Sequence, residues 1–207
     1  RGSYIFNTTI SGIDDADVCM LIGTNPRWEA PIINARIRKR WLSGNFSIGL
    51  IGEETDLTYP YEYLGDGAET LNKIALGDHK FCELLDKAER PMLIIGQGAL
   101  KNEDGGKFLS TARKIAESFG LISDDWNGFN VLHTAAGRVG ALDLGFVPGV
   151  GGFDVKGILD GVENGDIETV FLLGADEVDT GALKNSFVIY QGHHGDAGAH
   201  SADVILP

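Results

Sequence analysis

The chain has 207 residues, 43% of them hydrophobic and 23% charged, which is typical of a globular protein with a sizeable core. Its formal net charge of −13 disfavours a nucleic acid as partner, since such partners need clustered positive charge. Two cysteines, Cys19 and Cys82, are too few for a disulfide framework or for an iron–sulfur cluster, which usually takes about four cysteine ligands, and a reducing compartment is expected.

The charge is distributed unevenly along the chain. Residues 1–122 hold 14 basic and 17 acidic residues, whereas residues 123–207 hold 3 basic and 13 acidic residues. This difference indicates two regions with different surroundings. The longest apolar runs have the length of strands and fall far short of the roughly 20 residues of a membrane helix, so we expect no direct membrane insertion.

Short apolar runs that end at a glycine or proline predict β-strands buried on both faces of a sheet. They lie at residues 17–23, 46–52, 91–96, 169–174, 186–192 and 202–207. Apolar residues at helical spacing predict helices between several of these runs, with Gly120 as the C-terminal cap of the third. The predicted helices lie at residues 29–42, 67–77 and 104–120.

Strands that alternate with helices predict an α/β fold, with Rossmann-like, mostly parallel sheets and flanking helices. We expect a first α/β unit at residues 1–122 and a second at residues 151–207. Residues 123–150 would connect them through a short helix at about 130–142 and a Gly/Pro-rich segment. The second unit contains only two or three strand-like runs, so we expect it to be incomplete at its C-terminal end.

The residues that follow the predicted strands are the candidates for a binding pocket, because ligands bind beyond the carboxyl ends of parallel strands. The acidic segment "GEETD" at residues 52–56 stands where an acid could bind a ribose. The turns lack the G-x-G-x-x-G and P-loop patterns. The alternative interpretation is therefore that these residues are turns and helix caps that the fold requires without a ligand. The candidate pocket residues are Gly23, Thr24, Asn25, Gly96, Gly98, Gly174 and Gln191.

Two further stretches carry clustered functional groups. The basic segment Arg36–Arg40 lies on a predicted helix, and it forms either a solvated face or a contact with an acidic partner. Three histidines, His193, His194 and His200, stand near Asp196 and Asp203 in the Gly-rich segment 189–207. Adjacent histidines on a turn point apart, whereas a metal site needs converging ligands, so we interpret this segment as a packing loop without metal or catalysis.

Six segments resemble, in the same order, the large iron–sulfur subunit of respiratory complex I, which is the 75 kDa subunit in mitochondria and has bacterial counterparts. They are "YIFNTTISGIDDADV", "IGTNPRWEAPIINARIRKRW", "LIGEETDLTYPYEYLGD", "ALDLGFVPGV", "FLLGAD" and "IYQGHHGDAGAHSADVILP". The resemblance covers essentially the whole chain, back to Arg1. It implies that the chain is a fragment of that large subunit without its iron–sulfur domains.

The resemblance also implies a fold similar to that of molybdopterin oxidoreductases, whose post-strand motifs hold a guanine-dinucleotide pterin. The sequence retains "GTNP" at Gly23–Pro26. It departs from the pattern at "GADEVD", where a second Gly-x-Asn-Pro or Gly-x-Asp-Pro is typical, and at Gln191-Gly192, where Gln-Asp is typical. These departures indicate a decayed pterin site, with no catalytic residue, no metal ligand and no cofactor in this region.

The resemblance implies a scaffold region in a proton-pumping NADH:quinone oxidoreductase. The complete subunit would bind 2Fe-2S and 4Fe-4S clusters. It would contact the flavin/NADH-binding and quinone-module subunits of the peripheral arm, on the cytoplasmic face of a bacterial inner membrane or the matrix face of a mitochondrial one. The alternatives are a binding module with a working guanine-nucleotide or molybdopterin site, and a metal-dependent enzyme that uses the histidine loop.

Overall fold

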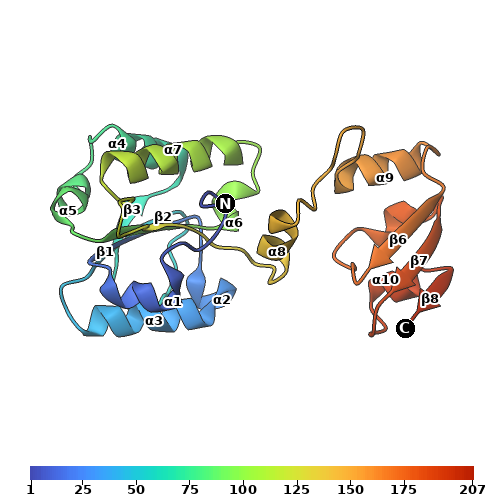
Figure 1. Ribbon diagram of the computed structural model, residues 1–207, viewed down its shortest axis with the longest axis horizontal. Coiled ribbons are helices and arrows are strands. Elements are labelled where there is room, and N and C mark those ends of the chain that lie inside the picture. The colour runs from blue at the N-terminus through green and yellow to red at the C-terminus, as the bar shows by residue number, and fades with distance from the viewer. The chain divides into compact units, whose positions relative to one another are not determined.

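The computed structural model describes all residues from Arg1 to Pro207 and divides into two compact units, Arg1–Leu144 and Gly145–Pro207. Each unit contains one parallel sheet with flanking helices (Figure 1), which confirms the predicted α/β class. No helix in the structure is both long enough and apolar enough to cross a membrane.

The first unit carries a five-stranded sheet in the order β3-β2-β1-β4-β5. Its strands are β1 (Val18–Ile22), β2 (Ser47–Ile51), β3 (Glu62–Gly65), β4 (Pro91–Ile95) and β5 (Phe129–Val131). Its helices are α1 (Thr9–Gly12), η1 (Ile13–Asp15), α2 (Pro26–Glu29), α3 (Pro31–Leu42), α4 (Gly67–Ala75), α5 (Cys82–Lys87), α6 (Gln97–Leu100), α7 (Gly105–Ser118) and α8 (Arg138–Asp143).

Helices cover both faces of this sheet because β1 and β4 are apolar at every position and buried throughout. On one face, Met20 and Ile22 pack against α4, α5 and α7; on the other, Cys19 and Leu21 pack against η1 and α3 (Figure 1). The predicted helices at 29–42, 67–77 and 104–120 correspond to α3, α4 and α7, and Gly120 follows α7 with the positive φ of 64° expected of a cap.

The structure differs from the prediction at the end of the first unit. We expected a boundary at residue 122 and a helix at about 130–142, but Phe129–Val131 forms β5 beside β4, the helix is the shorter α8, and the unit extends to Leu144. Asn130 obscures this strand in the sequence because a polar residue interrupts the apolar run. The Asn130 side chain is fully buried: it accepts a hydrogen bond from the Thr8 backbone N–H at 2.8 Å and donates one to Thr8 Oγ1 at 2.8 Å.

The basic segment Arg36–Arg40 connects α3 to η1 and to the residue that follows η1. Arg36 forms an ion pair with Asp14 at 2.8 Å, and Lys39 approaches the same carboxylate at 3.4 Å. Arg40 Nε donates to the Ala16 carbonyl at 2.7 Å. Several of the basic groups therefore make contacts within the chain. The sequence suggested only a solvated face or an acidic partner for them.

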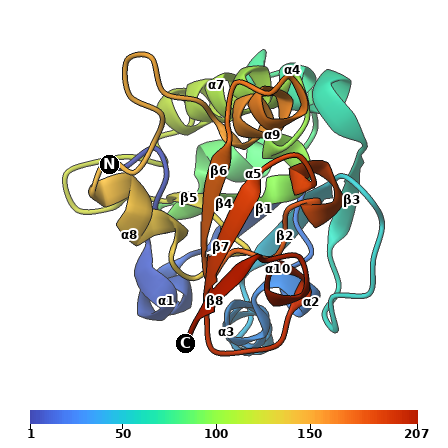
Figure 2. The same ribbon diagram turned by 90° about the vertical axis from the view of Figure 1, so that its right-hand side faces the viewer.

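The second unit has a three-stranded parallel sheet in the order β6-β7-β8 (Figure 2). Its elements are α9 (Val155–Glu163), β6 (Thr169–Leu173), η2 (Thr180–Leu183), β7 (Phe187–Gln191), α10 (Ala197–His200) and β8 (Val204–Leu206). The prediction that these strands are buried on both faces is wrong: exposed and buried side chains alternate along β6, and β8 is exposed throughout. Within this unit the helices that join the buried cluster all lie against one face of the sheet.

The first testable prediction concerns the N-terminal segment. Arg1 and Tyr4 donate hydrogen bonds to the carboxylate of Asp143 in α8, and they lower the pKa of Asp143 from 3.8 to about 2. A group whose pKa is lower in the folded state contributes stability above its unfolded pKa and loses that contribution as the pH falls through the folded pKa. We therefore expect this contribution to disappear between about pH 4 and pH 2.

The measurement is the urea midpoint as a function of pH for the unmodified chain and for Asp143→Asn. The variant should have a lower midpoint at pH 7, and its midpoint should change less between about pH 4 and pH 2. Asp104→Asn removes an exposed ion pair with Lys107 and serves as the control. Identical pH profiles for Asp143→Asn and the unmodified chain would contradict the assigned role of this contact.

Candidate functional site

A cavity of about 360 Å³ lies at the carboxyl ends of β1 and β2 in the first unit. The predicted pocket residues Gly23, Thr24, Asn25 and Gly98 all line it. So does Glu53, directly after β2 in the segment predicted to supply a ribose-binding acid. The position agrees with the rule for open α/β sheets, because β1 lies between β2 and β4, where the strand order changes direction.

The glycines at this edge permit two turns to pack backbone against backbone. Gly23 has a φ of 53°, and a Cβ atom there would lie 2.5 Å from the Ala99 backbone nitrogen. A Cβ on Gly96 would lie 2.4 Å from Thr24 Cβ, and one on Gly98 would lie 2.7 Å from the Gly23 carbonyl oxygen. Steric fit between the turns after β1 and β4 therefore accounts for all three glycines without any ligand.

The donors in the turn after β1 are already bonded to a carboxylate of the same chain. Glu29, at the end of α2, accepts a hydrogen bond from Thr24 Oγ1 at 2.9 Å and one from the Asn25 backbone N–H at 2.8 Å. An anionic ligand at this turn would use these same donors. The Glu29 carboxylate thus engages donors that a phosphate oxygen at this turn would need.

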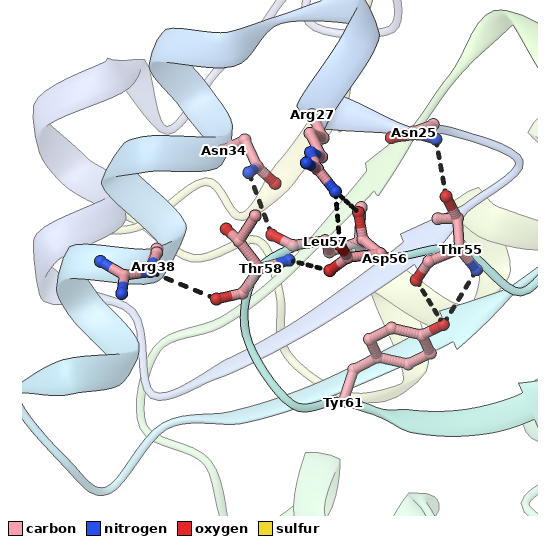
Figure 3. Close-up of polar contacts among 9 residues, drawn as sticks. All are labelled: Asn25, Arg27, Asn34, Arg38, Thr55, Asp56, Leu57, Thr58 and Tyr61. Carbon is pink, nitrogen blue, oxygen red and sulfur yellow. Dashed lines mark hydrogen bonds and ion pairs between the residues drawn. The ribbon is translucent and has the colours of Figure 1, made fainter.

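The loop after β2 binds Asn25 in this turn and Arg27 in α2 (Figure 3). Asn25 Nδ2 donates to Thr55 Oγ1 at 2.9 Å, and Arg27 forms an ion pair with Asp56 at 2.6 Å. Tyr61 fixes the loop, because its hydroxyl accepts from the Thr55 backbone N–H at 3.0 Å and donates to the Thr55 carbonyl at 2.8 Å. The amide nitrogen of Asn25 and the Arg27 cation are therefore both occupied, whereas Asn25 Oδ1 is buried without a hydrogen-bond partner.

The rest of this loop is bonded to α3 (Figure 3). Asn34 Nδ2 donates to the Leu57 carbonyl at 3.1 Å, and Arg38 Nε donates to the Thr58 carbonyl at 3.2 Å. The Thr58 backbone N–H and the Arg27 guanidinium, in that order of effect, lower the pKa of Asp56. The loop is held along its length by backbone and side-chain contacts, which leaves it little freedom to rearrange around a ligand.

The charge around the cavity is unsuitable for an anion. Glu29 and Glu53 line it, and no lysine or arginine does. A dinucleotide carries a pyrophosphate that needs free backbone donors or cations, and two carboxylates repel it. The residues present therefore do not fit a guanine-dinucleotide pterin.

The remaining predicted pocket residues, Gly174 and Gln191, lie in the second unit. With Asp176, Tyr190, His193 and Asp196 they line a cavity of about 650 Å³ after β6 and β7. A hydrogen bond with Asp196 raises the pKa of Asp176, and loss of solvent and the Asp196 charge act in the same direction. Carboxylates therefore line this second cavity as well, and their negative charge is unfavourable for a phosphate.

The histidine segment forms no convergent ligand set. His193 and His194 do not point apart as predicted: their rings meet edge to face with centroids 4.2 Å apart, and their Nδ1 atoms are in contact. His200 belongs to α10, and Asp203 accepts a hydrogen bond from the Val188 backbone N–H at 2.8 Å. No cluster of three or more His, Cys, Asp or Glu side chains in the chain is arranged to hold a metal ion.

Sequence reasoning missed the residues that occupy the first pocket. The sequence places Glu29 in a predicted helix and Thr55 in a turn, whereas the two side chains bond to the pocket's polar groups. The available signal was an acid four residues after Asn25, close enough across one helical turn to return to the donors of that turn. The loop contacts could not be found, because they join residues about thirty positions apart in a segment without periodicity.

All residues of the chain, 1–207, match the family model described as Molybdopterin oxidoreductase, and the chain belongs to this family. This match confirms the resemblance seen in the sequence. The chain is 44% identical to an NADH-quinone oxidoreductase subunit of Rickettsia bellii (strain RML369-C) and 45% identical to the NADH-ubiquinone oxidoreductase 75 kDa subunit of Reclinomonas americana. Each match covers the whole chain but only 29% of the relative.

The second prediction tests the Glu29 contact. Glu29→Gln keeps the size of the side chain but removes the charge and one of the two acceptor oxygens. We expect the free energy of unfolding to fall by about 1–3 kcal/mol, the usual range for losing hydrogen bonds to a charged group. The measurement is urea unfolding at pH 7.

Glu53→Gln is the matched control, because it removes the same charge from the same cavity but takes no part in the hydrogen bonds of the structure. We expect this control to change the free energy of unfolding by less than about 0.5 kcal/mol, as is usual for surface substitutions. Equal effects of the two variants would contradict the special role of Glu29.

Proposed function

We propose that this chain is a region of a subunit of a proton-pumping NADH:quinone oxidoreductase of a respiratory chain. Two relatives named as subunits of NADH-quinone and NADH-ubiquinone oxidoreductases support this assignment, at 44% and 45% identity over the whole chain. Since the chain spans 29% of their length, the activity belongs to the longer protein and its assembly.

Within that subunit, the proposed role of residues 1–207 is a non-catalytic scaffold that retains a pterin-binding fold without its ligand. The observation that carries this proposal is the internal bonding of the turn after β1. Glu29 accepts hydrogen bonds from Thr24 and Asn25, and Asp56 pairs with Arg27. A pocket whose donors are already satisfied gains little by binding an anion, because each new hydrogen bond replaces an existing one.

The cofactors and partners of the proposal belong to the longer protein. Its 2Fe-2S and 4Fe-4S clusters would be bound outside this region, which contains two cysteines, both buried and free. Its partners would be the flavin/NADH-binding and quinone-module subunits of the peripheral arm. The protein would lie on the cytoplasmic face of a bacterial inner membrane or the matrix face of a mitochondrial one.

A second candidate function is a working site for a guanine nucleotide or a molybdopterin. The family match and the cavity of about 360 Å³ favour it, since small-molecule sites are of about this size. The two carboxylates that line the cavity oppose it.

The third prediction separates these two functions by thermal unfolding of the longer protein in the presence of GDP and of molybdopterin guanine dinucleotide. A ligand that binds only the native state stabilises it by about 2.7 kcal/mol at a hundredfold excess over its dissociation constant. The scaffold proposal predicts no saturable rise in the unfolding temperature with either compound.

The same titration on Glu29→Ala provides the matched comparison, because this variant frees the Thr24 and Asn25 donors. A saturable rise with the unmodified protein that disappears in Asn25→Asp, which adds negative charge in the pocket, would establish the working site and reject the scaffold role. A rise seen only in Glu29→Ala would support the proposal that the carboxylate excludes the anion.

A further inference from the structure

The cavity of about 650 Å³ in the second unit is lined by hydrogen-bond acceptors of negative charge. Asp176 follows β6 and Asp196 follows β7, so two carboxylates line the cavity from the carboxyl ends of adjacent parallel strands (Figure 2). No lysine or arginine lines it. Residues 145–207 hold 10 acidic residues and 2 lysines, of which Lys156 is paired with Asp160. The charge of the cavity therefore has no cationic partner among the residues that line it.

The two carboxylates lie close enough to share a proton. Their hydrogen bond, loss of solvent and the charge of Asp196, in that order of effect, raise the pKa of Asp176. Two carboxylates side by side repel each other when both are ionised, and a shared proton relieves that repulsion. A cation between the two carboxylates relieves it in the same way. The pair thus favours a positively charged ligand over a neutral one.

A buried tyrosine places an unpaired hydroxyl in the same cavity. Tyr190 of β7 lines the cavity with only 2% of its surface exposed, and its hydroxyl makes no hydrogen bond within the chain. Burial and then the charges of Asp196 and Asp176 raise the pKa of Tyr190, which puts the hydroxyl near both carboxylates. A Cβ atom on Gly192 would collide with the hydroxyl oxygen, and one on Gly198 would lie 2.7 Å from the ring. Buried polar groups nearly always have a partner, so the free hydroxyl indicates a missing one.

A guanidinium group matches these acceptors better than a metal ion or an ammonium group. No cluster of three or more His, Cys, Asp or Glu side chains is arranged to hold a metal ion. A guanidinium is planar, always charged and carries five N–H donors in fixed directions, so it binds two carboxylates and still has donors for a hydroxyl oxygen. An ammonium group has only three donors and is more strongly hydrated. The cavity is also large enough for a complete arginine residue.

We propose that this cavity binds a guanidinium group between Asp176 and Asp196, with the Tyr190 hydroxyl accepting a further hydrogen bond from it. The group belongs either to a small molecule such as arginine or to an arginine side chain of a protein segment, and the experiments distinguish these two sources. The inference goes beyond the proposed scaffold role and does not depend on it, because only residues of the second unit carry it.

The fourth prediction is tested by isothermal titration calorimetry of the purified longer protein at pH 7. The probe is N-acetylarginine methylamide, and N-acetylcitrulline methylamide is the neutral control of the same shape. We expect saturable binding of the arginine compound and at least about tenfold weaker binding of the citrulline compound, because hydrogen bonds between charged groups are the stronger ones. Equal affinities for the two compounds, or tighter binding of guanosine than of the arginine compound, would overturn the proposal.

Three variants locate the site. Asp196→Asn removes one charge and should weaken binding of the arginine compound about tenfold or more, whereas Tyr190→Phe removes only the unpaired hydroxyl and should weaken it about threefold. Asp166→Asn is the matched control, because Asp166 is an exposed acid of the same unit that does not line the cavity. This control should leave the affinity unchanged. Equal affinities of Asp196→Asn and Asp166→Asn would count against the site.

A photo-cross-link in the complete assembly identifies the source of the guanidinium. His193, an exposed residue that lines the cavity, is replaced with p-benzoylphenylalanine, and cross-linked peptides are sequenced. A cross-link that is lost when an arginine of the captured peptide is changed to glutamine assigns the group to a protein segment, including where that segment keeps the probe out. Probe binding without a cross-link assigns it to a small molecule. Absence of both, or a cross-link that persists after every arginine of the peptide is changed, would refute the proposal.

Discussion

The arrangement of the first unit depends on one close contact, the packing of the turn after β1 against the turn after β4. Gly23 and Ala99 approach so closely that no side chain fits between the two backbones. This contact exists because β2 and β4 pair with opposite edges of β1, which brings successive strand ends together at one edge of the sheet. The geometry creates a pocket whether or not a ligand uses it, since the same glycines are required by the packing alone.

In that pocket the chain satisfies the donors of the first turn internally. Glu29 bonds to the donors of the first turn, Thr55 bonds to Asn25, and Asp56 neutralises Arg27. Each contact replaces one that an anionic ligand could make, and together they fix the loop after β2 against α3. These contacts support the proposed scaffold role in a member of the molybdopterin oxidoreductase family, because fold and function are set by different residues.

Periodicity in the sequence was sufficient for the central strands and the long helices. The runs that became β1 and β4 are apolar at every position, and the helix that became α7 repeats its apolar residues on one face. Elements with interrupted patterns were missed. Asn130 divides β5, and β3 is too short and too exposed to stand out. The pocket residues after the strands were predicted from topology alone, whereas Glu29 and the loop contacts depend on side-chain geometry that spacing does not encode. The apolar pattern of β6 and β7 predicted two covered faces, whereas buried and more exposed side chains alternate along both strands.

If residues 1–207 form a scaffold, as proposed, their pocket holds no pterin cofactor in the longer protein. The most direct measurement is the molybdenum and pterin content of the purified longer protein, by elemental analysis and by the fluorescence of the oxidised pterin, on the same sample in which iron is quantified. For a scaffold role we expect iron in stoichiometric amounts, with molybdenum and pterin far below one per polypeptide. Stoichiometric pterin, with or without molybdenum, would contradict it.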